Sequence, residues 1–204
     1  MIKKISNNDG SLLLKLARQS ILKEFKKENQ LESLKDKVSS WVLKEKRGTF
    51  VTLHKNSELR GCIGNIDPVK DIFTGIKDNA KHSAFSDTRF SPLSFEELDD
   101  TKIEISILTR PEIIDYNDYH DLIEKLKPGI DGVIIQKDHR SATFLPQVWD
   151  QLKSPEQFLT HLCTKAGLLS DAWQAGDLEV LVYQIQLFEE PPCGGSDSLS
   201  HSKA

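Results

Sequence analysis

The segment Leu59-Arg60-Gly61-Cys62-Ile63-Gly64-Asn65 combines a thiol, a guanidinium and two glycines within seven residues. Glycine weakens the interior of a strand, so the pair of glycines predicts a β-bulge or a close approach by another group. Strand alternation divides the segment between two faces. One face carries Leu59, Gly61 and Ile63, and the other carries Arg60, Cys62 and Gly64.

The face with Arg60 and Cys62 suggests a reactive cysteine. If the apolar face is buried, the two side chains face outward together, about 7 Å apart at the strand rise. A fixed cation at that distance favours the thiolate and lowers the pKa of a cysteine. The alternative is a half-buried cysteine in a core strand, since free cysteines commonly behave as small buried hydrophobes. Both interpretations stay open at this point.

Length and composition are typical of a soluble globular protein. The chain has 204 residues, of which 38% are hydrophobic and 28% charged, which is enough for one domain or two small ones with a real core. No apolar run approaches the roughly 20 residues of a membrane span. Residues 1–9 lack the apolar segment of a secretory signal. We therefore expect a cytoplasmic protein without membrane association.

Cysteine usage and charge narrow the class further. Cys62, Cys163 and Cys193 form a sparse, odd set without a Cys-x-x-Cys pair, which argues against a disulfide framework and a structural zinc site. We expect no metal or organic cofactor. The net charge of −4 does not favour nucleic acid. Residues 1–47 hold twelve Lys/Arg against six Asp/Glu, which we attribute to solvated helix faces.

Hydrophobic periodicity predicts an α+β fold with a mostly antiparallel sheet covered by helices. Strand pairs are joined by hairpins, and regular βαβ alternation is missing. The chain beyond residue 190, with Cys193, reads as a disordered tail. Longer helices are expected over residues 9–30, 67–85 and 154–166, with Asp9 and Asp67 as N-caps of the first two. Strands are expected over residues 49–54, 58–66, 102–108, 133–136, 141–145 and 178–188.

The first hairpin is the one whose register matters for Cys62. Matching apolar faces around a turn at residues 55–57 pairs Leu53 with Leu59 and Val51 with Gly61. The same register places Phe50 opposite Cys62, where its ring would shelter the thiol on one side.

Two further groups could contribute to a site. Glu104 faces away from three isoleucines in the strand over residues 102–108. It is expected to face solvent, and it gains functional interest only if its strand neighbours the strand of Cys62. Asp87 and Arg89 lie in the loop after the second long helix. For this pair, an ion pair that holds the loop is the simpler interpretation.

The motifs resemble those of the AMMECR family, named after a human chromosomal region linked to Alport syndrome, intellectual disability, midface hypoplasia and elliptocytosis. The resemblance covers about residues 9–190, and we treat residues 1–190 as one AMMECR-like domain and 191–204 as its tail. The helix before the Asp-x-Arg-Phe motif tends to be alanine-rich in relatives, whereas this chain has His82 there. The residues that carry the resemblance are Gly48-Thr49-Phe50-Val51-Thr52-Leu53, Leu59-Arg60-Gly61-Cys62-Ile63-Gly64, Asp87-Thr88-Arg89-Phe90-Ser91-Pro92, Pro128-Gly129-Ile130-Asp131-Gly132, Leu145-Pro146-Gln147-Val148 and Lys165-Ala166-Gly167-Leu168.

The resemblance implies an intracellular α/β domain with a larger and a smaller subdomain and an unsettled activity. In some prokaryotes the family domain accompanies a Memo-like protein and a radical S-adenosylmethionine protein, which implies a shared pathway. Roles around transcription, replication, repair or translation have been suggested for the human relative.

One functional hypothesis is an enzyme with Cys62 as nucleophile. Arg60 would lower the pKa of the thiol or bind a small anionic substrate, because its planar fork suits carboxylate or phosphate. The acid/base partner would be Glu104, His54 or His82. No histidine is at a spacing from Cys62 that requires contact.

The other hypothesis is a binding or adaptor module for a partner protein. Its surface would be the groove between the subdomains. The strand with Gly61 and Gly64 would form its floor, because glycines let a partner backbone come close. Arg60, Asp87 and Arg89 would line its edge. The acidic net charge favours a protein over nucleic acid as the partner.

Overall fold

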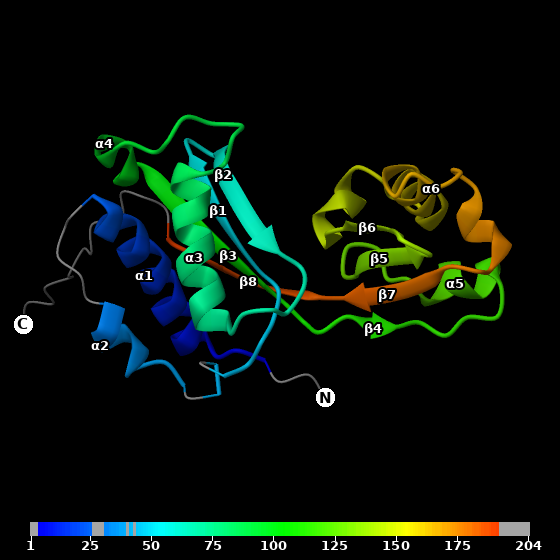
Figure 1. The fold of residues 1–204 in the computed structure, drawn as a ribbon, viewed down its shortest axis with the longest axis horizontal. Coiled ribbons are helices and arrows are strands. Elements are labelled where there is room, and N and C mark those ends of the chain that lie inside the picture. The colour runs from blue at the N-terminus through cyan, green and yellow to red at the C-terminus, as the bar shows by residue number, and fades with distance from the viewer. Residues whose placement is uncertain (1–3, 26–30, 40, 43, 192–204) are drawn as a thin grey trace, which may run out of the picture. The chain divides into compact units, whose positions relative to one another are not determined.

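The computed structural model describes residues 4–25, 31–39, 41–42 and 44–191, and confirms the α+β class with antiparallel strand pairs (Figure 1). The predicted tail, apart from residue 191, and Cys193 lie outside the described residues. The chain divides into two compact units. Unit 1 comprises Met1–Ile107 and Leu187–Ala204, and unit 2 comprises Leu108–Gln186. The strands are divided between two four-stranded sheets, where the sequence predicted one.

The first sheet has the strand order β2-β1-β3-β8. Its strands are β1 (Thr49–Lys55), β2 (Glu58–Asn65), β3 (Thr101–Leu108) and β8 (Ile185–Glu189), and the accompanying helices are α1 (Asn7–Glu24), α2 (Leu31–Lys35), α3 (Ile72–Phe85) and α4 (Phe95–Leu98). Helix α3 packs on β1 and β2, with α1 against α3 (Figure 1). Fully buried aliphatic side chains of β1, β3 and these helices form one core: Leu13, Leu16, Val51, Leu53, Ile76, Ile103 and Ile105.

The starts of the two long helices differ from the prediction. Ser6, not Asp9, is the N-cap of α1, and Asp9 instead accepts hydrogen bonds from Ser39. Asp71, not Asp67, caps α3 by accepting a bond from the N–H of Thr74. In each case several capping residues precede the apolar stripe, and tertiary contacts select which one is used.

The predicted register of the first hairpin is wrong. Asn56 and Ser57, both with positive φ (53° and 66°), form a two-residue turn that pairs Lys55 with Glu58. The register then shifts between Leu53 and His54, so that Arg60 has no directly opposed residue. Such a β-bulge follows the turn at the place where the glycines had suggested one.

The bulge determines which residues of β1 and β2 lie opposite each other. Leu53 lies opposite Gly61, Thr52 opposite Cys62 and Phe50 opposite Gly64. Leu59 is opposite His54 and so moves to the face of the sheet that Cys62 also occupies. The prediction assumed a three-residue turn and no bulge, which displaced the inner pairs by two residues.

Unit 2 contains the second sheet. The strand order is β4-β7-β5-β6, with β4 (Glu112–Ile113), β5 (Gly132–Lys137), β6 (Arg140–Phe144) and β7 (Glu179–Tyr183). The helices are α5 (Tyr119–Lys125) and α6 (Pro155–Lys165), with the 3-10 turns η1 (Pro146–Asp150) and η2 (Ala172–Ala175). Trp149 stacks on Phe158 with ring centroids 3.8 Å apart. Cys163 is fully buried beside them, as its helical stripe predicted.

The predicted strand over residues 178–188 is interrupted at Gln184. The backbone N–H of Gln184 donates to the hydroxyl of Thr109, and its carbonyl accepts from the N–H of Thr109. β7 therefore belongs to the second sheet and β8 to the first. Among the helices of the described residues, none is long and apolar enough to cross a membrane.

Candidate functional site

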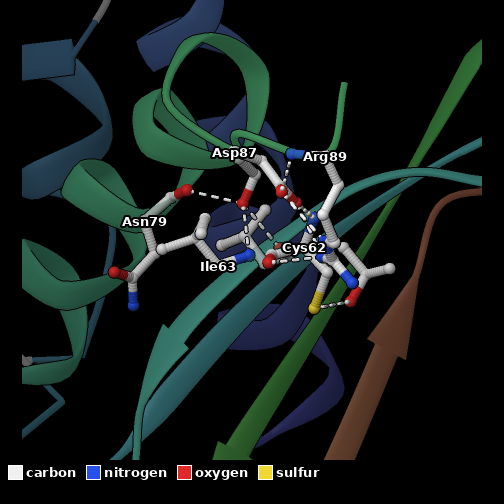
Figure 2. A network of polar contacts seen from close by, with 8 residues as sticks. Cys62, Ile63, Asn79, Asp87 and Arg89 are labelled. Carbon is white, nitrogen blue, oxygen red and sulfur yellow. Dashed lines mark hydrogen bonds and ion pairs between the residues drawn. The ribbon is translucent and has the colours of Figure 1, made fainter.

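Side chains cover the outer edge of β2 at Cys62. β2 is an edge strand, with β1 on its only paired side. The N–H of Cys62 donates to Oδ2 of Asp87 (2.8 Å), and its carbonyl oxygen accepts from Nη2 of Arg89 (3.1 Å). Figure 2 shows both side chains reaching Cys62 from the loop that follows α3. The pair therefore replaces the hydrogen bonds of a neighbouring strand and protects the edge.

Asp87 and Arg89 also bind each other. Oδ1 of Asp87 accepts from Nε of Arg89 (2.9 Å), and Oδ2 accepts from Nη2 (2.7 Å). The Asp87 side chain is 4% exposed and that of Arg89 55%. The hydrogen bonds from Arg89 and then from the Cys62 N–H hold the pKa of Asp87 well below its usual range. The same pairing raises the pKa of Arg89. The predicted loop-holding ion pair is confirmed.

Arg60 is paired with the carboxylate of Glu97. Its guanidinium makes two hydrogen bonds to Glu97, of 3.2 and 3.0 Å, and its side chain is 12% exposed. Glu97 also accepts from Nζ of Lys55 (3.0 Å) and from the N–H of Ser94 (3.1 Å). These bonds, the one from Arg60 first, lower the pKa of Glu97 to about 2. Arg60 thus ties the bulge to α4, and Arg89 is the cation that binds the backbone of Cys62.

The protein itself fills the room beside both glycines. A Cβ atom at Gly61 would lie closer than 3.0 Å to the carbonyl oxygen of Ser83 in α3. A Cβ at Gly64 would meet the ring of Phe50 at a similarly short distance. The close approach that the glycines predicted is therefore made by α3 and by the facing strand. Phe50 covers Gly64, and the prediction that it lies opposite Cys62 is wrong.

Ser83 joins α3 to the hairpin. Its hydroxyl accepts from the N–H of Ile63 (3.0 Å) and lies 2.7 Å from the carbonyl oxygens of both Val51 and Asn79. Figure 2 labels Ile63 and Asn79, whose backbone N–H and carbonyl groups bond to this hydroxyl. The N–H groups of Cys62 and Ile63 and the carbonyl of Cys62 are thus hydrogen-bonded to α3 or its following loop, which fastens β2 to the helix.

The thiol of Cys62 points away from α3. Gly61 faces the helix, so the next residue along the strand faces the opposite side of the sheet. The Cys62 side chain is half-buried there, and the hydroxyl of Thr52 lies 3.4 Å from its sulfur. Across the part of the chain that the structure describes, Thr52 is the only side chain that hydrogen-bonds this thiol.

Glu104 shares this face but not a neighbouring strand. Thr52 of β1 lies opposite both Cys62 of β2 and Glu104 of β3. Two strand spacings, about 10 Å, therefore separate the backbones of Cys62 and Glu104. Glu104 was expected to have a functional role only if its strand neighboured that of Cys62. β1 lies between these two strands, so this condition is not met.

The two histidines have different positions. Nε2 of His54 lies 3.8 Å from Oε2 of Glu104, on the same sheet face. Burial raises the pKa of Glu104, and the nearby His54 partly offsets this. His82 is exposed on α3, which covers the other face of the sheet from the one that Cys62 occupies. The structure brings Glu104 and His54 together, and it does not bring His82 to Cys62.

A polar pocket that the sequence did not predict lies beside the hairpin turn. We call it the hairpin pocket; its volume is about 570 Å³. Strand alternation could have grouped Lys102 with Glu104, but no local pattern connects them to Glu189, which is 85 residues beyond Glu104 in the sequence. Within the described residues, no group of three or more His, Cys, Asp or Glu is placed to hold a metal ion. The lining residues are His54, Asn56, Ser57, Asp100, Lys102, Glu104 and Glu189.

Comparison with known proteins identifies the family. The AMMECR1 family model matches residues 14–188. A protein of Thermofilum pendens is 38% identical over 202 residues, which cover 92% of each chain. Protein MJ0810 of Methanocaldococcus jannaschii is 39% identical and covers 89% of this chain and 90% of its own.

A solved structure agrees with these relatives. The crystal structure of the uncharacterised protein PH0010 from Pyrococcus horikoshii is similar with a TM-score of 0.79 and 36% identity. The similarity covers 95% of this chain and 97% of that one. The names of these three relatives state no activity. The chain belongs to the AMMECR1 family.

Proposed function

We propose that this chain is a binding module for a partner protein, with the surface of β2 as the contact region. The observation that carries the proposal is that residues of the segment 59–64 are engaged in contacts within the protein. Arg60 is bound to Glu97, and Gly61 makes room for α3. The backbone of Cys62 is bound by Asp87 and Arg89. These contacts build a rigid, covered strand edge.

The surroundings of the thiol support binding more than catalysis. A cysteine nucleophile is activated by a base or a cation within reach of its sulfur. Here the hydroxyl of Thr52 contacts the sulfur, and the guanidinium of Arg60 is held by Glu97. Arg89, which interacts electrostatically with Cys62, is paired with the carboxylate of Asp87. Glu104 is two strands away. The thiol-dependent enzyme acting on a small anionic substrate stays the alternative hypothesis.

Two exposed side chains mark the contact region. Leu59 is 43% exposed on β2, and the Arg89 side chain is 55% exposed where it binds Cys62. Leu59 and Cys62, whose carbonyl Arg89 binds, are about 10 Å apart along the strand. Arginine is enriched at protein interfaces, and Asp87 already fixes this one, which lowers the entropic cost of binding. The free thiols Cys62 and Cys163 suit the reducing cytoplasm as the compartment.

Paired leucine variants test the contact region. The full chain is immobilised, exposed to an extract of the source organism, and its retained proteins are quantified by mass spectrometry. Leu59→Ser should lose a specific partner that the wild type retains. Leu169→Ser changes a leucine that is 78% exposed in unit 2 and should retain it. Equal retention by both variants would contradict a role for β2.

Alkylation separates the two functional hypotheses. The folded protein is treated with iodoacetamide over a range of pH, and each cysteine is quantified by peptide mapping. The binding module predicts slow modification of Cys62 and a Cys62→Ala variant that keeps its partner. Rapid modification at neutral pH, together with loss of function in Cys62→Ala, would favour the enzyme.

A further inference from the structure

The hairpin pocket is a second place of recognition, next to the contact region on β2, since its lining residue His54 lies opposite Leu59. Its volume of about 570 Å³ falls within the range of small-molecule sites. All seven lining residues are polar or charged, and all belong to unit 1. They come from β1, the hairpin turn, β3 with the residue before it, and β8.

Glu104 is the residue on which the chemistry of this pocket depends. Its side chain is only 22% exposed. Among the described residues no N–H or O–H donates to its carboxylate, and its distance to His54, 3.8 Å, is beyond hydrogen-bond range. A half-buried carboxylate without donors from its own chain takes its hydrogen bonds from water or from a ligand. Burial raises the pKa of Glu104, and the nearby charges of His54 and Lys102 offset this only in part.

The charges around Glu104 select the sign of the ligand. The lining contains three carboxylates, one lysine and one histidine. Nζ of Lys102 lies 2.8 Å from Oε2 of Glu189, so these two charges compensate each other. Asp100 and Glu104 keep negative charge that no ion pair with Lys or Arg offsets in the described part of the chain. An anion would be repelled here, and a cation would be attracted.

We propose that the hairpin pocket binds a small aliphatic amine, with the ammonium group on the carboxylate of Glu104. An ammonium group carries three N–H donors and no acceptor, which matches an acceptor-only carboxylate. The side chains of Asn56 and Ser57 at the turn offer donors and acceptors for the rest of a polar ligand. The absence of a converging metal-ligand group among the described residues favours an organic cation over a metal ion.

Putrescine is the probe for this proposal, and the corresponding diol is its uncharged control. Binding to the full-length protein is followed by nuclear magnetic resonance at about 0.15 M ionic strength, which screens unspecific attraction beyond about 8 Å. We expect saturable shifts at Asn56, Ser57, Asp100 and Glu104 with putrescine and none with the diol. Shifts that are scattered over the acidic surface, do not saturate, or are absent would overturn the proposal.

Charge-neutralising variants give the matched comparison. Glu104→Gln keeps the size of the side chain and removes its charge, and it should weaken putrescine binding at least tenfold. Glu179→Gln removes the same charge from an exposed position in β7 of unit 2 and should bind as the wild type does. Equal weakening in both variants would show general charge attraction and refute the site. Because the shift map uses the wild type, the proposal is tested even if Glu104→Gln does not fold.

Discussion

The guanidinium of Arg89 lies 3.1 Å from the carbonyl oxygen of Cys62, in the position that the N–H of a neighbouring strand would take. The carboxylate of its partner, Asp87, accepts a hydrogen bond from the N–H of Cys62. One ion pair thus satisfies both backbone groups of an edge-strand residue. This arrangement explains why Asp87, although nearly buried, is charged: four N–H donors, one from Cys62 and three from Arg89, surround its carboxylate.

Removing Asp87 should destabilise unit 1 strongly. Asp87→Ala leaves the N–H of Cys62 without its acceptor and Arg89 without its counter-charge, which we expect to cost about 3 kcal/mol. Chemical denaturation of both variants measures the loss. Thr88→Ala, at an exposed position in the same loop, is the control and should stay within about 0.5 kcal/mol of the wild type. A small effect at Asp87 would mean that the loop does not hold the strand.

The link between Arg60 and Glu97 should appear as a pH dependence of stability. The pKa of Glu97 is lowered from 4.5 to about 2, so its contribution is complete above pH 4.5 and is lost as the pH falls toward 2. At pH 7, Glu97→Gln should lose about 1 to 2 kcal/mol, and the difference from the wild type should shrink steadily below pH 4.5.

The neighbouring residue supplies the control for this measurement. Glu96 is exposed on the same short helix, and Glu96→Gln should lose clearly less stability at pH 7. If the two variants behave alike, or if the difference at Glu97 does not depend on pH, the bulge is not held by the Arg60–Glu97 pair.

Hydrophobic alternation predicted most strands because burial on one face is a local property of the sequence. The strand with Ile103, Ile105 and Ile107 is the clearest example, and all three are fully buried. The turn was predicted at residues 55–57, one residue too long, because Asn56 and Ser57 lack the glycine that usually marks two residues of positive φ. The bulge at Arg60 follows from that turn and from a partner that lies 37 residues away.

The candidate site depended even more on long-range contacts. The sequence suggested an Asp87–Arg89 pair because the two residues are close in the chain, and the structure confirms it. It could not show that Cys62 is what the pair binds, since that contact spans 25 residues. It likewise could not assemble the hairpin pocket, whose residues come from three strands. Local sequence patterns predict the helices and strands and which of their faces are buried. The register of paired strands and the residues that meet across the fold depend on long-range contacts.

Gly61 should tolerate no side chain. A Cβ atom at this position would meet the backbone carbonyl of Ser83, and backbone cannot rotate away as a side chain can. Gly61→Ala is expected to destabilise the protein by about 1 to 3 kcal/mol through overpacking. Thermal unfolding measures this loss, and Leu59→Ala at an exposed position of the same strand is the control. Normal stability of Gly61→Ala would show that α3 does not pack on β2 this closely.

Ionisation of Glu104 should lower the free energy of unfolding. Burial raises its pKa, so the folded protein binds a proton there more readily than the unfolded chain does. Its contribution to stability therefore falls as the pH rises through the unfolded value of 4.5 and then the higher folded value. Glu104→Gln should be as stable as the wild type or more stable at pH 7, and this difference should disappear below pH 4.5, where both forms are neutral.

Denaturation curves of the wild type and Glu104→Gln at several pH values check this expectation, and saturating putrescine extends it. The diamine should stabilise the wild type at pH 7 and leave Glu104→Gln unchanged, because a ligand stabilises only the state that binds it. A variant that is less stable than the wild type at neutral pH would mean that the Glu104 carboxylate is already compensated within the fold. In that case the hairpin pocket would have no unmet charge for an amine to satisfy.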